Sequence, residues 1–291
     1  MRTMPAPLKE EPAALESNPS LTGMARMVAD VPFTCEGQRQ LLTLVLPARP
    51  ARREGPGDPF VVFLQGSAWT VPDRHWQLPQ LCAYAQQGVA VASIGHRDCL
   101  QGNPFPGYLK DAKAAIRFLR SEASSFGLDP ARAGFFGTSS GGNTALLVGL
   151  TGDDPRYRTD DYAQESDAVA AVVDCFGPAD LVSLQDTEAT LSDEMRLIMT
   201  SLIGDRDIPE ILRLMSPLHE VRDGAAYPPF LIAHGDRDSL VSYVQSVLMH
   251  RRLKAAGADT RLVRVMGGEH ESSVWSARTH GMILDFFKRH L

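Results

Sequence analysis

Short apolar runs alternate with helix-like segments along most of this chain of 291 residues. The run at 60–64 reads Phe-Val-Val-Phe-Leu, a helical pattern follows at 78–87, and a second apolar run follows at 89–94. Short continuous apolar runs are typical of strands that are buried on both faces. Strands that alternate with helices indicate βαβ units, so the sequence predicts an α/β fold with a mostly parallel, doubly wound sheet.

The same alternation returns further along the chain. The most regular helical pattern places Leu109, Ala112, Ile116 and Leu119 on one face at steps of three and four residues, and Gly127 is positioned to end this segment. Further strands are predicted at 133–136, 168–175, 230–233 and 261–265, and further helices at 141–150, 242–256 and around 286–287. One domain accounts for this order.

The alternation stops between residues 180 and 222. Helical patterns at 191–202 and 208–214 follow one another there without a strand between them. A lid or cap inserted into a sheet protein has this pattern, and ordinary crossover helices are the alternative.

The N-terminal part has a different composition. Residues 1–30 are rich in Pro, Ala and Glu, and predict a loosely held arm, with disorder as the alternative. A strand-like run at 40–46 precedes a segment at 48–58 crowded with Pro, Arg and Gly, which together indicate an opening hairpin. An arm of this kind could join two copies of the chain, so a homodimer is a hypothesis.

Charge and composition argue against several classes of function. The net charge of −6 provides no basic surface for nucleic acid or anionic lipid, so we expect neither as a partner. The four cysteines lie far apart without a CxxC pair, and the histidines show no HExxH spacing, so we expect no metal. The first residues lack the apolar stretch of a secretory signal, which favours a cytoplasmic location.

The sequence Gly137-Thr138-Ser139-Ser140-Gly141 matches the pattern G-x-S-x-G. It stands between a predicted short strand and a predicted helix of small residues, which is the context of a nucleophile elbow. Glycines flank such a serine because the turn is too tight for side chains. Ser139 is therefore the candidate nucleophile, and an ordinary structural turn is the alternative.

A serine hydroxyl needs a base to take its proton, and that base needs an acid to fix its tautomer. The loop after the predicted strand at 230–233 contains Asp236 and Asp238, and the glycine-rich loop after the last strand contains His270. We favour Asp238 over Asp236 as the acid because the spacing H-G-x-x-D-x-x-V leads to it. His234 is expected to support the loop.

Stabilising the tetrahedral oxyanion requires backbone N–H groups directed at the developing charge. Ser140, the residue after the nucleophile, would supply one. The loop that follows the strand at 60–64 suggests Ser67 and Ala68 for the second. Gln65 and Trp69 in the same loop are candidates for the substrate pocket, and packing of Trp69 against the sheet edge is the alternative.

Taken together, these motifs resemble the α/β-hydrolase superfamily, in its carboxylesterase branch of feruloyl and acetyl-xylan esterases. The stretches 111–119, 126–132 and 176–181 resemble the same branch. The order Ser139, Asp238, His270 is the order of that superfamily. The resemblance spans about residue 58 to the C-terminus. With the pattern of elements, it leads us to expect a single α/β-hydrolase domain at 31–291, with a lid or cap insertion at 180–222 as one interpretation. It also implies a two-step acyl-enzyme mechanism without cofactor or metal.

The expected substrates are short-chain or hydroxycinnamoyl esters, such as acetyl or feruloyl esters, of oligosaccharides or small alcohols. Two alternatives remain at this point. One is a small peptidase related to prolyl oligopeptidase, because fold and triad do not fix the leaving group. The other is a catalytically disabled binding protein, since Gln65, Ser67 and Ala68 depart from the usual H-G-G-G loop.

Overall fold

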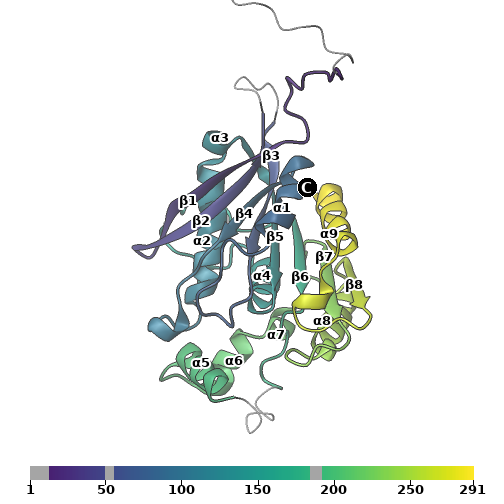
Figure 1. Cartoon of the computed structure of the whole chain (residues 1–291). Helices are drawn as coiled ribbons and strands as arrows, with labels where there is room; N and C mark the ends of the chain where they lie inside the picture. Colours follow the sequence, from purple (N-terminus) through teal and green to yellow (C-terminus); the bar gives the residue numbers. More distant parts are fainter. Residues whose placement is uncertain (1–12, 50–55, 184–191) are drawn as a thin grey trace, which may run out of the picture.

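The computed structural model describes residues 13–49, 56–183 and 192–291. In this part of the chain, eight strands form one sheet in the order β1-β2-β4-β3-β5-β6-β7-β8 (Figure 1). Strands β3 to β8 run parallel, whereas β1 and β2 are antiparallel to their neighbours, which confirms a mostly parallel sheet. The strands are β1 (Ala25–Cys35), β2 (Gln38–Pro47), β3 (Asp58–Leu64), β4 (Ala90–Ile94), β5 (Leu128–Thr138), β6 (Ala171–Cys175), β7 (Phe230–Gly235) and β8 (Thr260–Val265).

Helices cover both faces of the sheet. One face carries α1 (Leu78–Gln86) and α9 (Ala277–His290), and the other carries α2 (Gly107–Ser121), α4 (Ser140–Leu150) and α8 (Tyr243–Ala255). The short helix α3 (Ala123–Phe126) follows α2 and ends at Gly127, whose φ of 76° is the left-handed conformation expected at this position. Short 3-10 turns lie at η1 (Cys99–Gln101), η2 (Pro155–Tyr157) and η4 (Ser272–Val274).

Strand β3 shows why the apolar runs are continuous. Val61 and Phe63 belong to the core under α1 and α9, whereas Val62 and Leu64 belong to the core under α2 and α4. Consecutive side chains of a strand point to opposite faces, so a strand covered on both sides needs apolar residues at every position. All four side chains are fully buried.

The N-terminal region differs from the prediction in two ways. Strand β1 begins at Ala25, so the predicted arm at 1–30 ends earlier, and β1 and β2 form the opening hairpin through Glu36 and Gly37. Most of β1 is exposed or half-buried, which explains why it lacks an apolar run. Strand β2 pairs with β4 and not with β3, so the hairpin predicted to turn at 48–58 is wrong. Residues 1–12 and 50–55 lie outside the described part of the chain.

Among the described residues of 180–222, the helices that follow β6 are α5 (Asp193–Ile203), α6 (Ile208–Leu214) and α7 (Pro217–Glu220). Helices α5 and α6 lie beyond one end of the sheet, opposite the end from which the N-terminal segment leaves (Figure 1). Two contacts join the ends of this segment. The Leu181 N–H donates to Ser216 Oγ at 2.8 Å, and the Leu218 N–H donates to the Ala179 carbonyl at 3.0 Å. Residues 184–191, with the predicted helix start at 191, lie outside the described residues.

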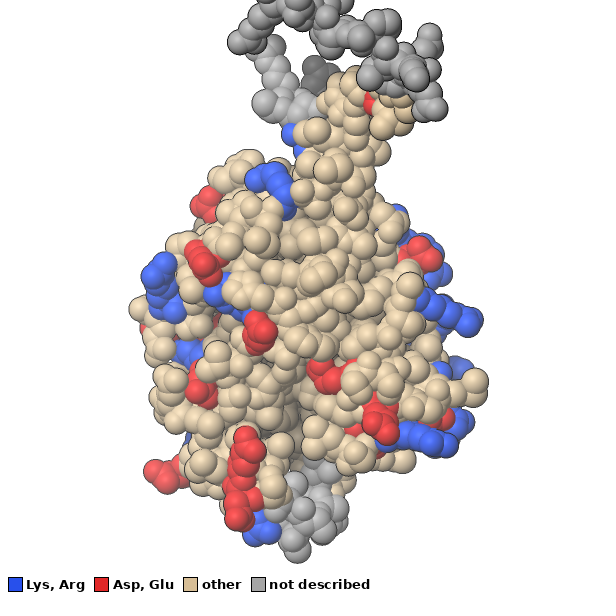
Figure 2. Space-filling model, in the orientation of Figure 1, with Lys and Arg blue, Asp and Glu red and all other residues tan. Residues whose placement is uncertain are grey.

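The surface carries charges of both signs. On the face shown in Figure 2, Lys and Arg side chains of the described residues are scattered and form no continuous basic patch. Within the described ranges, no helix has both the length and the apolar character needed to cross a bilayer.

Candidate active site

Ser139 lies at a sharp turn between β5 and α4, with φ 52° and ψ −123°. L-residues rarely adopt such angles, and a nucleophile elbow requires them. A Cβ atom at Gly137 would lie 1.9 Å from the Gly141 carbonyl oxygen, and one at Gly141 would lie 2.1 Å from the Leu64 carbonyl oxygen. The turn therefore needs glycine on both sides of the serine.

The three side chains of the predicted triad lie in one hydrogen-bonded row. His270 Nε2 is 3.0 Å from Ser139 Oγ, and His270 Nδ1 is 2.7 Å from Asp238 Oδ2. The His270 side chain is 14% exposed and that of Asp238 is fully buried. A proton can pass from the hydroxyl to the imidazole in this arrangement, while the carboxylate holds the other ring nitrogen.

Asp238 has further donors that keep it ionised. The N–H groups of Leu240 and Val241 donate to Oδ1 at 2.9 and 2.8 Å, and His234 Nε2 is 3.2 Å from Oδ2. Burial alone would raise the pKa of Asp238. The hydrogen bonds from His234, His270 and Val241 outweigh burial and hold the pKa well below its ordinary value.

His234 supports the acid loop and does not face Ser139. It is fully buried, with Nδ1 2.7 Å from Ser246 Oγ and Nε2 2.9 Å from the Val241 carbonyl. A carbonyl can only accept, so Nε2 carries the proton and donates to Val241 and Asp238. His234 thereby ties the loop of Asp238 to helix α8.

Asp236, the competing candidate for the acid, has other partners. Its carboxylate accepts from the Arg264 guanidinium at 2.7 Å and from the Gly267 N–H at 2.7 Å. These bonds lower the pKa of Asp236 and join the β7 loop to the loop that carries His270. Asp236 thus lies outside the row of Ser139, His270 and Asp238.

The loop after β3 is held against the elbow by two of its backbone donors. The Gly66 N–H donates to Thr138 Oγ1 at 2.9 Å, and the Ser67 N–H donates to Ser140 Oγ at 2.9 Å. The second bond gives the Ser67 N–H, which was predicted for the oxyanion hole, an acceptor within the chain. The other predicted donors are Ala68, with φ 49°, and Ser140. The latter opens α4, and N–H groups in a first helical turn have no acceptor within the helix.

The predicted pocket residues Gln65 and Trp69 both have local structural roles. Gln65 Oε1 accepts from the Asp73 N–H at 2.7 Å and braces the loop. The Trp69 side chain is buried in the core and its ring centroid lies 5.9 Å from that of Tyr108. The packing alternative therefore describes Trp69 in this structure.

Two polar neighbours of the site were not among the sequence candidates. Thr138 immediately precedes the nucleophile and is fully buried, and Glu271 follows His270 and bonds to Thr138. In the sequence, the only signal for these two residues is that each one is next to a motif residue. Among residues 13–49, 56–183 and 192–291, no three His, Cys, Asp or Glu side chains are grouped as a metal site would require.

Comparison with known proteins gives a consistent picture. The BD-FAE family matches residues 48–253. Esterase LipC of Mycobacterium tuberculosis is 32% identical over 212 residues, which are 72% of this chain and 50% of LipC. The chain spans about half the length of the curated relatives it matches.

Two solved structures share the fold over most of the chain. A truncated form of a carbohydrate esterase from gut microbiota has a TM-score of 0.76 at 27% identity, over 94% of this chain and 99% of that one. A bifunctional GH43-CE protein of Bacteroides eggerthii has a TM-score of 0.72 at 30% identity, over 86% of this chain and 33% of that one. With the family match covering most of its residues, the chain belongs to the BD-FAE family.

Proposed function

We propose that this protein hydrolyses carboxylic esters through a covalent acyl-enzyme on Ser139. The observation that carries the proposal is the unbroken row of hydrogen bonds from Ser139 through His270 to Asp238. Such a row activates a hydroxyl that is otherwise a weak nucleophile. The esterase names of relatives in the same comparison, such as LipC, support the same reaction.

In the first step, Ser139 Oγ attacks the ester carbonyl carbon and its proton passes to His270 Nε2. Asp238 stabilises the imidazolium and keeps Nδ1 protonated. The oxyanion accepts hydrogen bonds from the backbone N–H groups of Ser140 and Ala68. The tetrahedral intermediate then collapses, His270 gives its proton to the leaving alcohol oxygen, and the acyl group stays on Ser139.

In the second step, water gives a proton to His270 Nε2 and attacks the acyl carbonyl. The second tetrahedral intermediate collapses, and His270 returns the proton to Ser139 Oγ as the carboxylic acid leaves. Both steps use only water and groups of the chain.

The substrates we propose are short-chain or hydroxycinnamoyl esters, including acetyl and feruloyl esters, of sugars or small alcohols. The family membership and the likeness to a carbohydrate esterase from gut microbiota support this class. The helical segment 193–220 packs near the site, because α5 contacts η1 and α7 contacts α4, the helix that follows Ser139. We propose that it borders the substrate.

The test is turnover of p-nitrophenyl acetate, butyrate and octanoate, methyl ferulate, acetylated xylo-oligosaccharide and an aminoacyl amide. Ser139→Ala should reduce kcat by at least about 10⁴-fold while the melting temperature stays within a few degrees. Ser124→Ala, which changes an exposed serine on α3, is the matched control. Labelling by a fluorophosphonate probe should likewise require Ser139.

The outcomes separate the alternatives. Ester turnover that survives in Ser139→Ala would overturn the assignment of the nucleophile. Cleavage of the amide in preference to every ester would favour a peptidase. Folded wild-type protein that neither turns over esters nor reacts with the probe would indicate a disabled site.

A further inference from the structure

The residue after His270 has a strained backbone. Glu271 has φ 65° and ψ −69°, and the Ser272 N–H donates to the His270 carbonyl at 2.8 Å, which closes a three-residue γ-turn around Glu271. A γ-turn with positive φ is rare and strained for a residue with a side chain. Glycine would adopt this conformation more easily, which suggests that the glutamate side chain has a role of its own.

The Glu271 carboxylate points back to the nucleophile strand. Thr138 Oγ1 lies 3.2 Å from Glu271 Oε1 and also accepts the Gly66 N–H at 2.9 Å. Because the amide can only donate, the hydroxyl uses a lone pair for Gly66 and directs its proton to Glu271. Glu271 is thus joined through one hydroxyl to the start of the loop that carries Ala68.

The surroundings of this carboxylate contain few charges. Among the described residues, the titratable groups that interact with it are the His270 imidazole from its own loop and the Cys175 thiol from β6. Burial raises the pKa of Glu271, while the Thr138 hydroxyl and His270 act in the opposite direction. Burial, with Asp174 and Glu271 adding to it, raises the pKa of the Cys175 thiol well above its ordinary value, so this thiol stays neutral. On its other side, His270 faces Asp238.

We propose that Glu271 is a positioning residue that serves His270 as a second carboxylate and links the base loop to the oxyanion loop. This inference rests on the proposed function of Ser139 and His270. The Glu271 charge favours the imidazolium that forms when Ser139 attacks, and the Thr138 bridge fixes His270 and Gly66 relative to the elbow.

A negative charge beside the base makes it easier to protonate, so removing that charge moves protonation to lower pH. In Glu271→Gln, the amide oxygen can still accept from Thr138 while the charge is lost. The acid limb of kcat/KM should therefore move down by about half a pH unit, and kcat at its plateau should fall about tenfold with KM within twofold.

Two further variants make the test specific. Glu269→Gln removes an exposed charge one residue before His270 and should leave kcat, KM and the acid limb as in the wild type. Glu271→Gly relieves the strained φ but removes both the charge and the Thr138 bond. It should keep its melting temperature and lose more kcat than Glu271→Gln.

A histidine NMR titration provides a readout without a substrate. The pH at which the His270 ring takes up a proton should be lower in Glu271→Gln than in Glu269→Gln. Equal His270 titration and an unshifted acid limb in both variants would overturn the role of Glu271, even in an active esterase. Failure of the wild type to hydrolyse any ester would instead refute the proposed function, while the NMR comparison would still test the coupling.

Discussion

Two buried carboxylates in this protein have similar surroundings and, in the proposed mechanism, different roles. Asp238 accepts from His270 and His234, and Asp167 accepts from Lys113 Nζ at 2.6 Å and Arg117 Nη1 at 2.8 Å. Both carboxylate side chains are fully buried, and both also accept backbone N–H groups.

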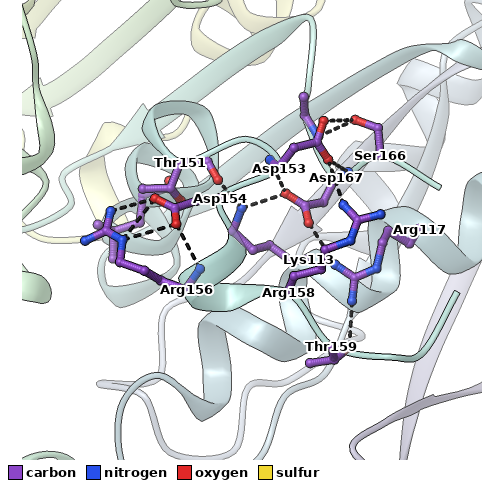
Figure 3. Close-up of polar contacts among 12 residues, drawn as sticks. Lys113, Arg117, Thr151, Asp153, Asp154, Arg156, Arg158, Thr159, Ser166 and Asp167 are labelled. Atoms are coloured by element: carbon purple, nitrogen blue, oxygen red, sulfur yellow. Dashed lines mark hydrogen bonds and ion pairs between the residues drawn. The ribbon is translucent and has the colours of Figure 1, made fainter. Parts of the chain in front are cut away.

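The Asp167 cluster joins helix α2 to the loop between α4 and β6 (Figure 3). Lys113 also donates to the Thr151 carbonyl, and Arg117 also donates to Thr159 Oγ1. The Lys113 and Arg117 side chains are fully buried, so solvent has no access to the partners of Asp167.

The partners explain the difference in role. A guanidinium holds its protons at any ordinary pH, whereas an imidazole exchanges its proton near neutrality. His270 keeps 14% of its side chain exposed, in contrast to both partners of Asp167. The comparison teaches that burial and hydrogen bonding of a carboxylate do not identify it as a catalytic acid. The distinguishing feature is a partner that can exchange a proton and that lies next to an accessible nucleophile.

The largest expected effect is on catalysis at Asp238. Asp238→Asn should reduce kcat by about 10³ to 10⁴-fold, because the amide no longer selects the His270 tautomer with a free Nε2 lone pair. Steady-state kinetics on the best ester measures this loss, and circular dichroism verifies folding. A loss below tenfold in folded protein would show that another group orients His270.

Asp167→Asn should act on stability instead of chemistry. Two buried cations would then face a neutral amide in place of the carboxylate that they share, and breaking a buried ion pair costs about 3–5 kcal/mol. Urea unfolding measures the change, with Asp160→Asn in the same loop as the exposed control. If Asp167→Asn were as stable as Asp160→Asn, the cluster would contribute nothing to the fold.

A third buried carboxyl, Asp174 on β6, has neither kind of partner. Its Oδ1 accepts the Gly177 N–H at 2.9 Å, and in the described part of the structure its Oδ2 has no hydrogen-bond partner. Burial raises the pKa of Asp174 to about 8, and the Gly177 bond only partly opposes this. Because the unfolded pKa is about 3.9, the folded state holds an extra proton between these values, and stability falls as pH rises through this window.

Asp174→Asn should remove this loss of stability at high pH. The amide keeps the shape of the protonated acid, so the variant should resemble the wild type at pH 5 and exceed its stability by about 2–4 kcal/mol at pH 9. Urea unfolding at both pH values measures the difference. If the free energy of unfolding changed with pH in the same way in both proteins, Asp174 would be ionised in the folded state.

The smallest effect is expected at Asp236. Asp236→Asn weakens the bonds to Arg264 and Gly267 that join the two loops, and should lower kcat by less than tenfold without moving the acid limb. The same ester assay used for Asp238→Asn gives the ratio of the two losses. A larger loss in Asp236→Asn would reverse the assignment of the acid.

Much of the fold could be predicted because strands such as β3 contain an unbroken apolar run, here residues 60–64. The β1–β2 hairpin could not be predicted, since β1 is a largely exposed edge strand whose pairing depends on β2 and not on an apolar pattern. At the site, the three motif residues stood at strand ends. The bond from the Ser67 N–H to the Ser140 hydroxyl could not be predicted, because it joins loops far apart in the sequence. Glu271 was missed for the same reason, since its bond to Thr138 joins residues 133 positions apart.

The two contacts that join the ends of the helical segment have a consequence for protein engineering. Leu181 bonds to Ser216 and Leu218 bonds to Ala179, so the chain leaves the sheet and returns to it at nearly the same place. A segment with adjacent ends can be exchanged for one of another length at little entropic cost, since the closure is already made. Grafts between residues 181 and 216 that keep the Ser216 hydroxyl offer a way to combine this sheet core with helical segments from other family members.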